Sequence, residues 1–223
     1  MVYAPGSTTA ALNLRRNKLK KLYQSPLLLF SILLLVIILV TASGPAEKVL
    51  GANARIVYLH GAWVWTALFG FAAAALAGSL GLILRRNNLH LWSRALGRTG
   101  LLFWITYLPL SMWAMQANWN GLFLAEPRWR FAMVFAIGGL VLQVGVSLIE
   151  RPAGASIANI AFLLALIFAL ANTENVMHPP SPILNSDAAR IQFFFVVLLI
   201  LILLAASQIA RWWYKQDVHH AHA

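Results

Sequence analysis

Long, uninterrupted apolar runs separated by short polar segments dominate the sequence. These runs approach or exceed the roughly 20 residues that an α-helix needs to cross the hydrocarbon of a bilayer. Continuous runs exclude a transmembrane barrel, whose strands alternate between apolar and polar residues. The predicted fold class is therefore all-α, a polytopic membrane helical bundle. We expect six transmembrane helices, at residues 26–42, 56–84, 99–117, 131–149, 154–172 and 191–213.

Composition supports this prediction and excludes several kinds of site. Hydrophobic residues make up 61% of the 223 residues and charged residues only 10%, whereas a soluble domain carries about 25% charged residues. The sequence has no cysteine. Disulfides, iron–sulfur clusters, thiolate zinc sites and covalently attached heme are therefore excluded.

The basic residues indicate a topology rather than a nucleic-acid partner. The net charge is +11, and 12 of the 17 Lys and Arg residues lie in four segments, namely the N-terminal tail, a loop at 85–98, a turn at 150–152 and the tail from 211 onward. The segments at 43–55, 117–130 and 172–190 hold five basic and four of the six acidic residues. The positive-inside rule then places both termini in the cytoplasm and the second set outside. No nucleic acid is expected as a partner, because no basic groove or stacking module is visible.

The apolar runs and the distribution of charge divide the chain into three regions. We expect a basic cytoplasmic tail at 1–25, a six-helix transmembrane domain at 26–213 and a His-rich cytoplasmic tail at 214–223. The run from Pro26 to Ala42 is long enough to be a retained first helix rather than a cleaved signal peptide. No nucleophile–base pair, phosphate loop or metal-protease motif is present, so we expect no enzymatic activity.

Two histidines are the principal candidates for chemistry. Ionisable residues at membrane depth are costly and mark functional sites. His60, near the start of the second span, and His178, in the last outer loop, are both expected on the outer side at similar depth. Two neutral imidazoles from separate segments can hold a heme iron from both sides. Taken singly, each histidine is more often a packing residue than a ligand, so this pair is suggestive rather than specific.

The neighbouring residue types suit a heme. Gly61 and Ala62 would leave room for a flat macrocycle, and Tyr58 and Trp63 could pack on its faces. Propionates need cationic partners. The candidates for that role on the outer rim are Arg55, Arg128 and Arg190.

The same residues carry a resemblance to a known family. Residues 55–82, with Arg-Ile-Val-Tyr-Leu-His ending at His60, resemble the second span of the CcmC family of cytochrome c-type biogenesis proteins. Asn-Val-Met-His, ending at His178, resembles the segment that holds the family's second heme-ligand histidine. The resemblance covers about residues 26–210. It implies a bacterial inner-membrane protein with heme b held by His60 and His178, a periplasmic heme acceptor and an ABC-type transporter complex as partners.

One loop departs from the family pattern. The family has a tryptophan-rich outer loop, with an acid and a following arginine, that presents heme to an acceptor. Here the acid and arginine correspond to Glu126 and Arg128, while Leu122, Phe123 and Ala125 stand where tryptophans are expected. The flanking Trp119 and Trp129, with Phe123, would have to cover the macrocycle. The chain therefore resembles a divergent member of the family.

Three functions remain open from the sequence. The first is heme b binding at the outer face for delivery in cytochrome c-type biogenesis. The second is a membrane cytochrome b subunit that keeps its heme for electron transfer, which the altered loop favours because retention needs no presenting surface. The third is a heme-free structural or permease-like subunit. Outside the heme residues, His90 is interpreted as an interfacial residue and Gln143 as a polar link between helices.

Overall fold

The computed structural model describes residues 25–149, 151–174, 183 and 187–221. No β-strand occurs in these residues, which form six helices. The helices are α2 (Pro26–Ala42), α3 (Ala54–Leu84), α4 (Asn87–Trp119), α5 (Pro127–Ile149), α6 (Pro152–Ala171) and α7 (Ala189–Ala221).

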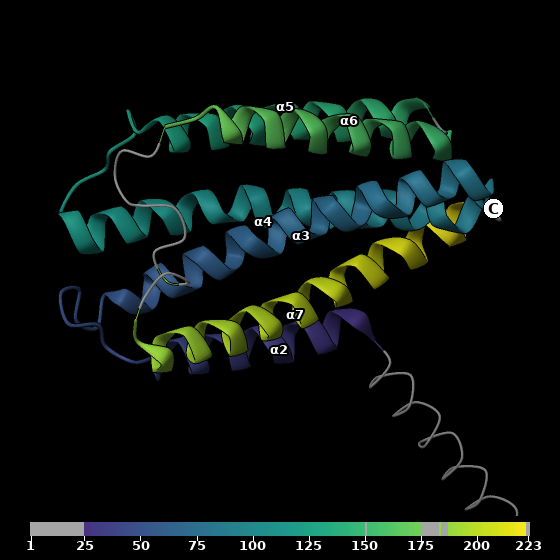
Figure 1. Ribbon diagram of the computed structural model, residues 1–223. Helices are drawn as coiled ribbons and strands as arrows, with labels where there is room; N and C mark the ends of the chain where they lie inside the picture. The colour runs from purple at the N-terminus through teal and green to yellow at the C-terminus, as the bar shows by residue number, and fades with distance from the viewer. Residues whose placement is uncertain (1–24, 150, 175–182, 184–186, 222–223) are drawn as a thin grey trace, which may run out of the picture.

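The six helices run antiparallel in chain order and form three layers (Figure 1). The central layer is the pair α3 and α4, with α5 and α6 on one side and α2 and α7 on the other. We call the end where α3, α5 and α7 begin the His60 end, because His60 lies in the second turn of α3. The opposite end, where α4 and α6 begin, is called the His90 end.

Four helices are long and apolar enough to cross a membrane, namely α3, α5, α6 and α7. The fifth apolar helix, α2, has 17 residues, and α4 has 33 residues with a polar first half. The length and composition of these helices indicate a membrane protein.

One expected boundary is wrong. The sequence predicted a loop at 85–98, but only the short connection before Asn87 is non-helical and the rest forms the first three turns of α4. The segment from 214 onward, predicted to be a cytoplasmic tail, continues α7 as a helix through Ala221. In both places polar residues have partners on other helices. The expected tail at 1–25 falls almost entirely outside the described residues.

The central pair is held by a very close helix contact. A Cβ atom added to Gly70 of α3 would lie 2.9 Å from the Cα of Gly100 on α4, and one added to Gly100 would lie 2.9 Å from Cδ1 of Phe71. Small residues at such contacts let the backbones of membrane helices touch and gain van der Waals packing. This point therefore fixes the register of α3 against α4.

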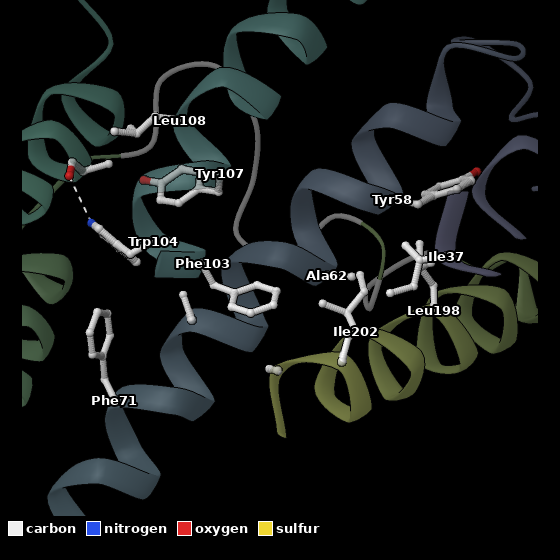
Figure 2. Close-up of a cluster of buried hydrophobic side chains, with 14 of the residues drawn as sticks. Ile37, Tyr58, Ala62, Phe71, Phe103, Trp104, Tyr107, Leu108, Leu198 and Ile202 are labelled. Atoms are coloured by element: carbon white, nitrogen blue, oxygen red, sulfur yellow. Dashed lines mark hydrogen bonds between the residues drawn. The ribbon is translucent and has the colours of Figure 1, made fainter. Parts of the chain in front are cut away.

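Aromatic side chains fill the space beside this contact. Phe71 packs on the ring of Trp104 with a centroid separation of 6.0 Å, and Trp104 packs edge-on to Tyr107 at 5.0 Å (Figure 2). The indole Nε1 of Trp104 donates to the carbonyl of Ala132 at 3.0 Å, which ties α4 to the second turn of α5. The aromatic core thus connects the central pair to the α5–α6 layer.

The glycine contact predicts the effect of a minimal change. Gly70→Ala should lower the free energy of unfolding by about 1–3 kcal/mol, because the new methyl meets backbone that cannot move aside. Gly138→Ala is the matched control, since nothing lies within 4 Å of a Cβ at Gly138. Thermal unfolding in detergent, followed by fluorescence, measures both. An equal loss in the two variants would show that the α3–α4 contact is not special.

Candidate functional site

His60 is half-buried on the face of α3 that packs against α4. Its ring lies 5.6 Å from the ring of Tyr107, at an interplanar angle of 59°. One turn further along, Trp63 packs on Phe103 with centroids 4.8 Å apart and donates from Nε1 to the Thr106 hydroxyl at 2.8 Å. Trp63, an expected partner of the macrocycle, therefore packs in the α3–α4 contact.

The Gly61 side of the candidate site is closed. A Cβ added to Gly61 would meet Cε2 of Phe195 at 3.3 Å and Cδ1 of Ile183 at 3.5 Å. Ala62 is fully buried in the core. The expectation that Gly61 and Ala62 leave room for a macrocycle is therefore wrong, because α7 and Ile183 occupy that side. On its other side, His60 faces α4.

The first turn of α5 brings three of the predicted residues together. Oε2 of Glu126 accepts a hydrogen bond from the backbone N–H of Trp129 at 2.8 Å and so caps the helix. Arg128 and Trp129 are half-buried beside it, whereas Trp119 and Phe123, in the preceding segment, are exposed. Glu126, Arg128 and Trp129 form one group here, and we call it the α5 start.

A chain of contacts links His60 to the α5 start. The His60 ring packs on Tyr107, Tyr107 packs on Trp104, and Trp104 packs on Phe131 with centroids 6.2 Å apart. Phe131 follows Trp129 by two residues on α5. The aromatic residues between His60 and the α5 start therefore lie on α4 (Tyr107 and Trp104) and on α5 (Phe131).

The other two rim arginines have different surroundings. Arg55 donates from Nε to the carbonyl of Gly44 at 2.8 Å and so holds the connection between α2 and α3. Within that connection the backbone N–H groups of Leu50 and Val49 donate to the Glu47 carboxylate, and these hydrogen bonds lower the pKa of Glu47. Arg190 is exposed at the start of α7. Arg55 therefore holds the connection before α3, and Arg190 lies on the surface at the start of α7.

Several buried polar atoms at the His60 end have no hydrogen-bond partner in the described part of the chain. They include the Tyr58 hydroxyl, Nε of Arg128 and Nε1 of Trp129, which are donors, and Oδ1 of Asn118, an acceptor. The large majority of buried side-chain polar atoms are hydrogen-bonded, so each exception calls for an explanation. Two of these donors belong to the α5 start, where a ligand with an anionic group would satisfy them.

These observations test whether the residues fit a heme. A half-buried imidazole, aromatic neighbours on α4 and α5, and a buried cationic donor are the chemical groups that a heme with its propionates requires. The described residues supply these groups around His60, whereas Phe195 and Ile183 fill the Gly61 side. His178 lies outside the described residues, and within them no three His, Cys, Asp or Glu side chains converge.

Sequence reasoning missed a buried polar cluster at the His90 end. Nδ1 of His90 is 2.7 Å from the Ser156 hydroxyl, and Nδ2 of Asn159 donates to the carbonyl of Ser93 at 2.8 Å. Gln143 donates from Nε2 to Oδ1 of Asn159 at 3.0 Å, as its predicted linking role requires. His90, Ser93, Ser156 and Asn159 are all buried. His90 is therefore not an interfacial residue but part of the link between α4 and α6.

Glycines make room for this polar cluster. A Cβ on Gly97 would lie 2.5 Å from Oδ1 of Asn159, and one on Gly81 would lie 2.8 Å from Nδ1 of His90. A Cβ on Gly78 would lie 2.9 Å from the Ser93 hydroxyl oxygen. The sequence did indicate where this cluster lies, because glycines recur on α3 and α4 at the positions where its polar side chains pack.

No protein-family model matches this sequence, and no match was found among curated proteins. The resemblance to the CcmC family therefore stays a prediction from the residues around His60 and His178. The function has to be argued from the chemistry of the site.

The polar cluster predicts a selective effect on stability. Asn159→Ala should lower the free energy of unfolding by about 1–2 kcal/mol, because Gln143 and the Ser93 carbonyl lose their partner inside the bundle. Asn172→Ala is the control, since Asn172 is exposed and bonds only to a carbonyl one turn earlier. Thermal unfolding in detergent compares the two. Equal stability of Asn159→Ala and the parent protein would contradict a stabilising role.

Proposed function

We propose that this protein binds heme b at the His60 end of the bundle and handles it for cytochrome c-type biogenesis. In this proposal the chain crosses a bacterial inner membrane six times with both termini in the cytoplasm, and the His60 end faces outward. The proposal rests above all on one observation. A half-buried histidine on α3 faces α4, and the neighbouring α5 start carries an arginine and a tryptophan with buried, unsatisfied donors.

Each residue has a defined task in the proposed site. His60 would supply one axial imidazole, and the Tyr107 ring beside it would restrict the orientation of that imidazole. Arg128 and Trp129 would donate hydrogen bonds to propionate oxygens. Glu126 would hold the first turn of α5 through the Trp129 backbone so that both donors stay in place. Heme, when bound, would supply an iron centre and two carboxylates.

His178 is the proposed second ligand, as the resemblance implies. The nearest described residue after it is Ile183, five positions along the chain. Ile183 packs at Gly61, in the same turn of α3 as His60. Five residues of extended chain reach at most about 18 Å, so this contact is compatible with both imidazoles serving one iron.

The surface near the site favours delivery of heme to an acceptor over retention of heme for electron transfer. Trp119 is 39% exposed and Phe123 is 41% exposed, in the segment that leads directly to the α5 start. Exposed aromatic side chains suit contact with an acceptor protein. The proposed partners are a periplasmic heme acceptor and an ABC-type transporter complex. If the bound heme cannot be transferred to an acceptor and gives a stable reduced spectrum, the protein is instead an electron-transfer subunit.

The ligand assignment predicts a loss of heme. Protein expressed with ample heme and purified in detergent should show a Soret band, and His60→Ala should lose most of it because one axial ligand is gone. His219→Ala, at an exposed histidine near the end of α7, should keep the parent spectrum. Heme per protein is measured by the pyridine hemochrome assay. A parent protein without a Soret band, or unchanged heme in His60→Ala, would defeat the proposal.

The propionate assignment predicts a difference between two nearby arginines. Arg128→Gln should weaken heme binding by about tenfold, the size expected for a lost charge-assisted hydrogen bond. Arg130→Gln removes an equal charge from an exposed side chain two residues away and should change the affinity by about twofold or less. Hemin titration of heme-free protein, followed at the Soret band, gives both constants. Equal effects would mean that Arg128 acts only through overall charge.

A further inference from the structure

A second cluster of charged residues joins α4 to α7 at the His90 end. Nη1 of Arg98 pairs with Oδ1 of Asp217 at 2.9 Å, and the Arg98 guanidinium carbon lies 5.3 Å from the centre of the Trp213 ring. The Asp217 side chain is only 7% exposed. The pair therefore lies partly inside the bundle.

Arg94 extends this cluster toward α5. It stands one turn before Arg98 on the same face of α4 and is half-buried. Its Nη2 donates to the Val146 carbonyl on α5 at 3.4 Å, and its charge interacts with those of Arg98 and Asp217. The face of α4 that carries both arginines is therefore bounded by α5 on one side and α7 on the other.

The hydrogen-bonding capacity of this cluster is not used up. In the described part of the chain, Nε of Arg94, Nε1 of Trp213 and Oδ2 of Asp217 are buried without a hydrogen-bond partner. Two donors and one acceptor thus remain. Two guanidinium groups against one carboxylate also leave this face with one net positive charge, which a buried site has to compensate.

We propose that this face of α4 binds the head group of an anionic glycerophospholipid that carries a free hydroxyl, such as phosphatidylglycerol. The phosphate oxygens accept hydrogen bonds from Arg94 and Trp213, and the head-group hydroxyl donates to Asp217. The single negative charge of this lipid matches the net charge of the site. This proposal is independent of heme.

The alternatives satisfy fewer of these requirements. A choline head group has no donor for Asp217, and an ethanolamine head group supplies a donor but leaves the positive charge uncompensated. Free phosphate could contact the same donors. A lipid is favoured over it because α5 and α7, which bound this face, are long and apolar enough to cross a membrane, where lipid head groups are abundant.

Native mass spectrometry of the full-length, delipidated protein tests the proposal with phosphatidylglycerol, phosphatidylethanolamine and phosphatidylcholine in turn. Phosphatidylglycerol should bind about tenfold more tightly than phosphatidylcholine, and Arg94→Gln should remove most of that difference. Arg86→Gln is the control, because Arg86 is an exposed cation at the same end. It should change the affinity by about twofold or less.

A second variant separates binding from folding. Trp213→Phe keeps an aromatic ring beneath Arg98 but removes the indole N–H together with part of the bicyclic ring, and it should bind phosphatidylglycerol several-fold more weakly. Thermal unfolding without added lipid checks that both variants are folded. Three results would overturn the proposal: no preference for phosphatidylglycerol, an equal loss in Arg86→Gln, or displacement of the lipid by millimolar inorganic phosphate.

Discussion

The contact between Gly70 and Gly100 is the constraint on which the rest of the bundle depends. Because the two backbones touch there, α3 and α4 cannot slide past each other without a clash. That register brings His60 opposite Tyr107 at one end. At the other end it brings the Ser93 hydroxyl to the carbonyl of Ala74 on α3, at 2.8 Å. The two polar regions of the molecule are thus positioned by one apolar contact between them.

Buried polar residues serve two purposes in this bundle. In hydrocarbon no hydrophobic force holds helices together, so close packing and hydrogen bonds between helices have to do so. At the His90 end, Asn159 and Ser156 of α6 find partners on α4, and Gly97 leaves the space that Asn159 fills. At the His60 end, Arg128 and Trp129 are half-buried, and Nε of Arg128 and Nε1 of Trp129 are buried atoms without a partner in the described residues. Unused buried donors weaken a fold, so a ligand explains them better than packing does, here and at Arg94 and Trp213 of the His90 end.

A structural feature could be predicted from the sequence where neighbouring residues determine it, and could not be predicted where residues far apart in the chain meet. The apolar run at 26–42 gave the bounds of α2 without error, and the other spans differ mainly where polar residues extend a helix. Arg94 and Arg98 suggested a loop because their charges look solvated, and their real partners could not be seen. Arg98 pairs with Asp217, 119 residues away, and no local pattern reveals a contact at that distance.

The same distinction applies to the candidate site. Glu126, Arg128 and Trp129 were expected to lie close together and do, because they are neighbours on one helical turn and their grouping is local. The space beside Gly61 was expected to be open and is filled, because the residue that fills it, Phe195, belongs to the last helix. Small residues in a sequence show where a close approach is possible, but not whether a ligand or another helix makes it.

The closed Gly61 side changes what the proposed heme site requires of α5. If a ligand contacts His60 from the α4 side, its anionic groups meet the N-terminal turn of α5, where the helix dipole already favours negative charge. The Glu126 carboxylate uses one backbone N–H of that turn and opposes an incoming anion. Arg128 offsets that negative charge, and Trp129 adds a neutral donor. The α5 start is therefore a site of no net charge with a fixed backbone and two buried donors, which suits a carboxylate that is bound firmly enough to be oriented and loosely enough to leave.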